Sequence, residues 1–178
     1  MSHQPTAKSQ AQPTATTAHR GTDVASGIAR YLDQADCLKL WATGLSAQQL
    51  AAAPVAGAWS MHTLICHMLD SELAAVHRMR RIAAEELPLL IAYDETAFAA
   101  RLPYAAQSAH ESAELFAALR HFHGNFLQAL PAAAFARAGV HNHRGRITLA
   151  EMVSMYVEHV DHHEKFAKAK RAALGCSA

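Results

Sequence analysis

Two histidines near the end of the chain have a spacing that suits a shared metal ion. His159 and His163 are four residues apart within the segment LAEMVSMYVEHVDHHEKFAKAKRA, residues 149–172. Side chains four apart in a helix lie on adjacent turns, so both imidazoles can point at one ion. The apolar periodicity places His163 near the middle of the buried stripe and His159 near its edge, whereas His162 points away. The same spacing also fits two partly buried histidines that hydrogen-bond to neighbours, so a third ligand is needed to decide.

A third imidazole is available in an earlier segment of helical character, residues 59–82. His67 flanks the apolar face of this segment, beside the small side chains of Ser71 and Ala74. Small neighbours would leave a pocket next to His67 rather than a packed seam between helices. A histidine at the boundary of the core, in contact with solvent, is the alternative that the spacing leaves open.

Two other features carry weaker chemical signals. Cys66 precedes His67 but points about 100° away from it around a helix, which favours an inert buried thiol over a nucleophile. Residues 141–146, HNHRGR, form a basic stretch before the last helix. This stretch could hold an acidic substrate or the carboxylates of a thiol cofactor, or it could be an ordinary solvated loop.

A series of short motifs runs through the chain in order. The motifs are Trp59-Ser60, His67 with Asp70 and Glu72, Pro88, Asp94-Glu95, Tyr104, Arg120, Arg137 to His141, Gly145, Thr148-Leu149 and His159 to His163. This series resembles the DinB/YfiT-like superfamily from about residue 23 to about residue 172. The resemblance implies a four-helix bundle that binds a divalent metal ion through three histidines. The matching positions here are His67, His159 and His163.

The resemblance also implies an activity. Three neutral imidazoles would leave a coordination position open, as catalytic metal sites require. The family resemblance points to a metal-dependent transferase that conjugates a low-molecular-weight thiol to an electrophilic small molecule, with a metal-bound thiolate as nucleophile. A hydrolase using a metal-bound water is the alternative, followed by a non-catalytic metal-binding stress protein. Nickel, zinc and iron all suit imidazole ligands and are not distinguished.

Several residues are expected around the three ligands. Each metal-bound imidazole should donate its second ring N–H to an acceptor, and Asp70, Glu158 and Asp161 are near in sequence. For Asp70, a solvent-facing helix charge is the alternative. Tyr104 and Arg120 match family positions and are expected to line the pocket or to pack against the end of the bundle.

Long helices must position these residues, and the sequence predicts four. Helices are expected over residues 23–43, 60–86 and 107–129 and from residue 148 onward, with a short helix starting at residue 46. Ser46 with Gln49 and Thr148 with Glu151 match capping boxes, and Gly44 suits a helix C-terminus. The apolar stripe expected in the third long helix consists of Leu115, Leu119, Phe122, Phe126 and Leu130. The stripe of the fourth is expected to include Leu149, Met152, Val153, Tyr156, Val160 and Phe166.

We find no alternation of apolar and polar residues typical of strands, which predicts an all-α fold. The connections after the second and third long helices hold roughly 15 to 20 residues each, longer than simple hairpin turns. The sequence therefore predicts a four-helix bundle with long crossover connections and short additional helices.

Composition bounds the class of protein. A chain of 178 residues, 51% hydrophobic and 17% charged, is long and apolar enough for one folded domain. A net charge of +1 argues against nucleic-acid binding, and no apolar run approaches the roughly 20 residues of a membrane span. Three cysteines without CxxC spacing indicate reduced thiols. We expect a cytoplasmic protein with a flexible tail over residues 1–21 and a bundle over residues 22–175. Its expected partner is a small-molecule substrate, with no nucleic acid and no membrane, and a homodimer is an open alternative.

Overall fold

The computed structural model describes residues 24–176, and the predicted tail over residues 1–21 lies outside them. The α-helices are α1 (Val24–Asp33), α2 (Cys37–Ala42), α3 (Ala47–Ala51), α4 (Met61–Ala84), α5 (Glu95–Arg101), α6 (Ala109–Gln128) and α7 (Leu149–Ala173). The 3-10 helices are η1 (Tyr104–Ala106) and η2 (Ala132–Ala136), and the strands are β1 (Leu89–Leu90), β2 (Ala138–His141) and β3 (Gly145–Thr148). None of the helices between residues 24 and 176 combines the length and hydropathy that a bilayer span requires.

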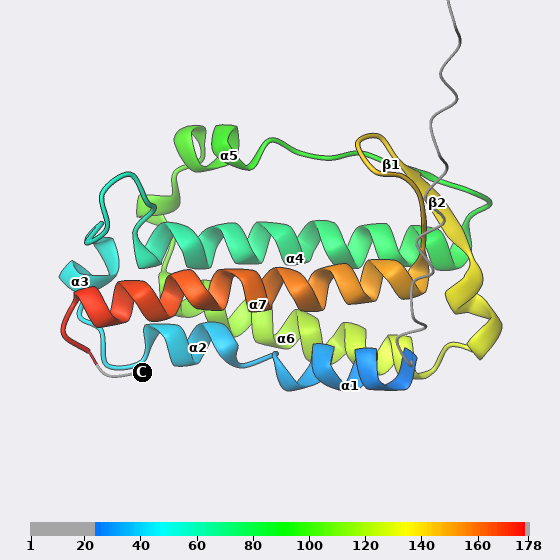
Figure 1. Cartoon of the computed structure of the whole chain (residues 1–178), viewed down its shortest axis with the longest axis horizontal. Coiled ribbons are helices and arrows are strands. Elements are labelled where there is room, and N and C mark those ends of the chain that lie inside the picture. The colour runs from blue at the N-terminus through cyan, green and yellow to red at the C-terminus, as the bar shows by residue number, and fades with distance from the viewer. Residues whose placement is uncertain (1–23, 177–178) are drawn as a thin grey trace, which may run out of the picture.

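Among the described residues, the long rods of the bundle are α1 followed by α2, α4, α6 and α7 (Figure 1). The helix α4 packs against α6 and α7, and α1 packs against the same two helices. The first rod and α4 therefore face each other across the bundle, as do α6 and α7. In each of these diagonal pairs the two rods follow each other in the chain, so the connection between them must cross the end of the bundle. The predicted four-helix bundle with long connections is confirmed.

The first rod is not the single helix predicted over residues 23–43, because it breaks between α1 and α2. At the break, the amide of Ala35 donates to the carbonyl of Leu32 at 2.9 Å instead of to the carbonyl of Tyr31. The freed Tyr31 carbonyl accepts a hydrogen bond from Nη1 of Arg120 at 3.2 Å, and the same nitrogen donates to Oε1 of Gln34 at 3.0 Å. A buried guanidinium thus satisfies the backbone group that the interrupted helix leaves unpaired.

Most predicted helix ends are confirmed by side chains that bond to the first turn. Ser46 begins α3 and Thr148 begins α7, each with both hydrogen bonds of a capping box. Ser60 begins α4 by accepting from the amide of Thr63. Gly44 follows α2 with φ of +74°, a conformation that costs glycine little. These local signals fix where α4 and α7 start, and therefore how the histidines on them are aligned along the bundle.

In the apolar stripe predicted for α6, Leu119, Phe126 and Leu130 pack against the core, whereas the other two positions are wrong. Leu115 is 48% exposed and Phe122 is 64% exposed. The buried face of α6 consists of Ala109, Ser112, Ala113, Phe116, Ala117, Arg120, His123, Gly124 and Leu127. The large polar side chains of Arg120 and His123 lie on this face, so the most buried positions of α6 are shifted away from the stripe that hydropathy predicts. Arg80 of α4 covers part of that stripe, with its guanidinium 4.4 Å from the ring centre of Phe126. In α7, likewise, Phe166 is exposed and the buried residue is Ala167.

A small sheet at one end of the bundle was not predicted (Figure 1). Strand β1 pairs in parallel with β2, and β2 pairs antiparallel with β3. Strands of two to four residues are too short to show a periodicity in the sequence. Gly139 is required at the β1–β2 contact, since a Cβ there would lie 2.9 Å from the carbonyl oxygen of Pro88. The sheet fixes the extended chain after α4 next to the hairpin that leads into α7.

Candidate metal centre

Three histidines from two helices converge in the middle of the bundle. His67 lies on α4, and His159 and His163 lie one turn apart on α7. One ring nitrogen from each residue lies within 4.8 Å of the other two. The Nε2 atoms of His159 and His163 are 3.0 Å apart. The three imidazoles that the family resemblance singled out are therefore brought together by the tertiary structure.

The geometry and the burial of this group fit a metal ion. Two imidazole nitrogens bound to one tetrahedral zinc at about 2.0–2.1 Å lie about 3.3 Å apart, close to the separation between His159 and His163. Nε2 of His67 is buried and has no hydrogen-bond partner among the described residues. Buried polar atoms are nearly always paired, so an unpaired nitrogen on an imidazole of this group is a feature that a bound cation would satisfy.

All three imidazoles are held in the neutral form that binds metals. Burial, together with the neighbouring His163 and His67, lowers the pKa of His159 to about 3. Burial and the proximity of His67 and His162 likewise lower the pKa of His163 to about 3. Burial also lowers the pKa of His67, against the opposing effect of two nearby carboxylates. At neutral pH the nitrogen lone pairs are therefore available to a cation.

The acceptor beside His159 is a hydroxyl and not one of the carboxylates proposed from the sequence. Oγ of Ser71 lies 3.3 Å from Nδ1 of His159, at hydrogen-bond distance. Asp70 accepts a hydrogen bond from the hydroxyl of Tyr104, and it acts on the histidines only through its charge, which raises the pKa of His67. Asp161 instead accepts from Nη2 of Arg30 at 2.8 Å. Ser71 therefore has the orienting position that the sequence suggested for an acid.

The remaining expected residues have hydrogen-bond partners other than the ring nitrogens. Tyr104 is buried in η1, where it connects to α4 through Asp70. Arg120 is fully inside the core, where its Nε donates to Oε2 of Glu72 at 3.0 Å. Cys66 is buried, and burial raises the pKa of its thiol, which agrees with the inert role expected for it.

Two residues at the site were not assigned to it from the sequence. Oε2 of Glu95, in the first turn of α5, lies 3.8 Å from Nε2 of His67. The ring of Trp59 packs against the His67 ring, with their centres 5.1 Å apart. Both residues belong to the motifs that carry the family resemblance. Their contact with His67 depends on how α5 and the chain before α4 fold back, which no local spacing reveals.

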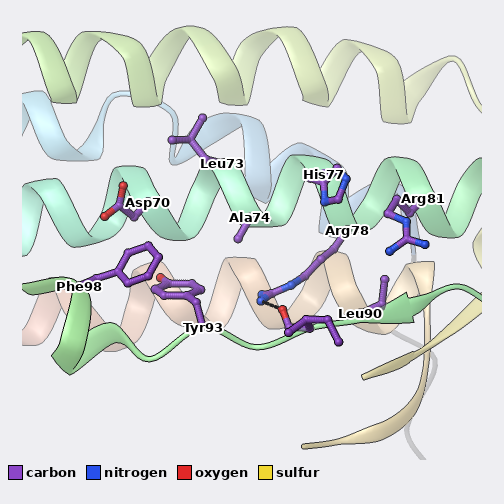
Figure 2. Close-up of a pocket in the computed structure, with 10 residues that line it drawn as sticks. Asp70, Leu73, Ala74, His77, Arg78, Arg81, Leu90, Tyr93 and Phe98 are labelled. Atoms are coloured by element: carbon purple, nitrogen blue, oxygen red, sulfur yellow. Dashed lines mark hydrogen bonds between the residues drawn. The ribbon is translucent and has the colours of Figure 1, made fainter. Parts of the chain in front are cut away.

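A cavity of about 830 Å³ opens beside His159. Its lining residues are Ser71, Arg78, Ala92, Tyr93, Glu95, His141, His143, Arg144, Met155, Tyr156, Glu158, His159 and His162. A second cavity, of about 350 Å³, lies between α4 and the extended chain that leads to α5 (Figure 2). Arg78 and Tyr93 line both cavities, and Figure 2 shows the Arg78 side chain extending from α4 toward that chain. The larger cavity gives a small molecule access to the candidate metal centre.

Fold and site together define a helical bundle with three neutral histidines that converge beside an open cavity. Residues 31–167 match the DinB superfamily, and the chain therefore belongs to this superfamily. The family expected from the motifs is thus confirmed over most of the chain.

Individual relatives extend this assignment. A protein of Bacillus licheniformis is 26% identical over 139 residues, which cover 78% of this chain and 79% of the relative. A protein of Oceanobacillus iheyensis is 28% identical over 126 residues, which cover 71% of this chain and 73% of the relative. Both are named as proposed metal-dependent hydrolases.

Among solved structures, YfiT from Bacillus subtilis is similar to this chain with a TM-score of 0.81, covering 94% of this chain and 95% of YfiT. That structure is described as a probable metal-dependent hydrolase with an unusual four-helix bundle topology. At 22% identity this likeness establishes the shared fold, including the crossed order of the long helices.

Proposed function

We propose that this protein is a metal-dependent hydrolase in which His67, His159 and His163 hold one divalent cation. The observation that carries the proposal is the convergence of three neutral imidazoles, two of them with an unpaired buried nitrogen. The names of the two sequence relatives support hydrolysis as the reaction class. Three protein ligands would leave coordination positions for a reactant, as in other catalytic metal sites.

A bound divalent ion would supply Lewis acidity and would lower the pKa of a coordinated water toward neutrality. The side chains of the protein supply the remaining functions. Ser71 orients the ring of His159 through its hydrogen bond to Nδ1. Glu95 is near enough to His67 to accept a proton from a water molecule at the site. The cavity between the β2–β3 hairpin, α4 and α7 receives the substrate.

Elemental analysis of untagged protein tests the metal site directly. We expect about one divalent ion per chain in the wild type and loss of most of it in His163→Ala, because two remaining imidazoles hold a cation far more weakly. His162→Ala is the matched control, since this neighbouring imidazole is exposed and lies outside the group. Equal metal content in the two variants, or none in the wild type, would refute the assignment of the ligands.

Transfer of a low-molecular-weight thiol to an electrophile is the second candidate function. The same three histidines would serve it, and a cavity of about 830 Å³ is large enough for a peptide-sized thiol. Whether turnover requires an added thiol distinguishes the two reactions. Turnover of an ester or amide in the absence of any thiol supports hydrolysis, whereas product that forms only with a thiol, and contains it, supports transfer. A protein with a full complement of metal and neither activity would fit a non-catalytic binding role.

A further inference from the structure

The cavity beside the histidines is lined by a group of basic residues that the proposed hydrolysis does not use. This basic cluster consists of Arg78, His141, His143 and Arg144. Arg78 comes from α4, and the other three come from β2 and the turn that follows it. Ser71 and His159 line the same cavity, so a single ligand can reach both the basic cluster and the candidate metal centre.

Arg78 is a buried cation without an acidic partner. The residue is only 9% exposed. Its Nη1 donates to the hydroxyl of Tyr156 at 2.7 Å, and its Nη2 donates to the carbonyl of Ile91 at 2.6 Å. Both acceptors are neutral, and none of the ion pairs recorded between residues 24 and 176 involves Arg78. Buried charges are normally paired, because an uncompensated charge is costly to remove from water.

The two neutral acceptors also fix the direction of the guanidinium. A guanidinium has five N–H donors in a planar fork, and these two hydrogen bonds leave the others available. The hydrogen bond to Ile91 holds Arg78 between α4 and the extended chain, as Figure 2 shows. Arg78 is therefore positioned in advance to bind a planar anion such as a carboxylate through a pair of hydrogen bonds.

The second arginine adds positive charge to the same region. Arg144 lies in the turn between β2 and β3, and no recorded ion pair within the described chain involves it. The pKa of His141 is lowered first by burial and then by Arg78, Arg144 and His143. Every charged neighbour that acts on His141 is thus basic. This surrounding favours an anion at the hairpin end of the cavity.

Two acidic residues also line the cavity, and one of them lies next to His67. Glu95 lies 3.8 Å from His67, and Glu158 precedes His159 on α7. The cavity therefore combines an acidic side near the candidate metal centre with a basic side at Arg78 and the hairpin. A substrate with one anionic group and one hydrolysable group would match this distribution of charge.

We propose that the basic cluster binds a carboxylate of the substrate, so that the substrates are carboxylate-bearing esters or amides whose scissile bond reaches the three histidines. This inference rests on the proposed hydrolase function for the reaction, but the binding of a carboxylate can be measured without turnover.

Titration calorimetry with glutarate and its uncharged diamide tests the proposal on the full chain, first loaded with metal and then stripped of it. We expect glutarate to bind about tenfold more tightly than the diamide in both forms, since charge-assisted hydrogen bonds distinguish the two probes. Because the metal-free measurement needs neither an ion nor catalysis, failure of the hydrolase proposal would leave this result unaffected.

Two arginines of the same hairpin provide a matched pair of variants. Arg144 lines the cavity, whereas Arg146 is exposed and is absent from the lining. We expect Arg144→Gln to weaken glutarate binding about threefold and Arg146→Gln to leave it unchanged. Arg78→Gln should weaken it about tenfold or more, provided that thermal unfolding shows a folded variant. Equal affinity for the two probes, or equal effects of the Arg144 and Arg146 substitutions, would overturn the proposal.

Discussion

Glu95 is placed next to the candidate metal centre by a helix that contributes nothing to the core. Its carboxylate oxygen lies 3.8 Å from Nε2 of His67, and none of the residues of α5 is buried. A carboxylate at this position can accept a proton from a water molecule without itself binding the metal ion. Its role is separable from metal binding, which makes it a useful residue to change.

We expect Glu95→Gln to retain metal and to lose about 10²–10⁴-fold in kcat, the range associated with a positioned acid or base. Metal content and kcat, measured on the same preparations, check this. Glu111→Gln is the control, because Glu111 is also an exposed acid in the first turn of a helix and lies on α6. Loss of metal in Glu95→Gln would instead make Glu95 a ligand, and unchanged kcat would remove it from the reaction.

At the scale of helices, a buried ion pair joins α4, which carries His67, to α6. Arg120 of α6 and Glu72 of α4 are each about 1% exposed, and their nearest atoms are 3.0 Å apart. Glu72 also accepts from the hydroxyl of Tyr31 on α1, and Nη2 of Arg120 donates to the carbonyl of Tyr156 on α7 at 2.8 Å. This network contacts all of the long rods. It also satisfies the Tyr31 carbonyl that the break in the first rod leaves unpaired.

We expect Arg120→Met to lower the free energy of unfolding by about 3–5 kcal/mol, because Glu72 would remain buried without a cation. The double variant Arg120→Met with Glu72→Leu should recover much of this loss, since it removes both charges and retains apolar volume. Urea unfolding of the wild type, both single variants and the double variant gives the coupling energy. Additive effects of the two substitutions would contradict the structural role of the pair.

At the scale of the whole molecule, buried neutral histidines make stability depend on pH. Burial lowers the pKa of His123 to about 4, and burial with neighbouring imidazoles lowers those of His159 and His163 to about 3. An unfolded histidine has a pKa of about 6.5. Below that pH the unfolded chain binds more protons than the folded chain, so the free energy of unfolding decreases as the pH is lowered. The loss begins near pH 6.5 and, for His123, is complete near its folded value of about 4.

His123 allows this effect to be tested away from the candidate metal centre. Both of its ring nitrogens are buried and unpaired among the described residues. Between about pH 7 and about pH 5, we expect metal-free His123→Leu to lose less stability than the wild type, by on the order of 1–2 kcal/mol. Chemical denaturation at the two pH values measures this. His121→Leu, at an exposed position, should keep the wild-type dependence, and an equal dependence in both variants would contradict the assignment.

The sequence predicted the elements well where the signals are local. Helix starts at Ser46, Ser60 and Thr148 follow from side chains that bond to amides three residues away, so a short stretch of sequence contains the whole interaction. The prediction was wrong where a distant residue decides. Arg120 of α6 pairs with the Tyr31 carbonyl that the break in the first rod leaves free, and Arg120 and His123 occupy buried positions of α6 that the predicted apolar stripe leaves out.

The candidate site divides in the same way. The four-residue spacing of His159 and His163 follows from helical periodicity, and the motifs of the chain single out His67 as their partner. Only the tertiary structure gives the distances between these imidazoles and the uncompensated charge of Arg78. It also shows the hydroxyl of Ser71 beside His159 and the carboxylate of Glu95 beside His67. The physical reason is that residue types and helical periodicity are local properties of a sequence. The packing of α4 against α7, and of α5 and the hairpin around them, depends on contacts between residues far apart in the chain.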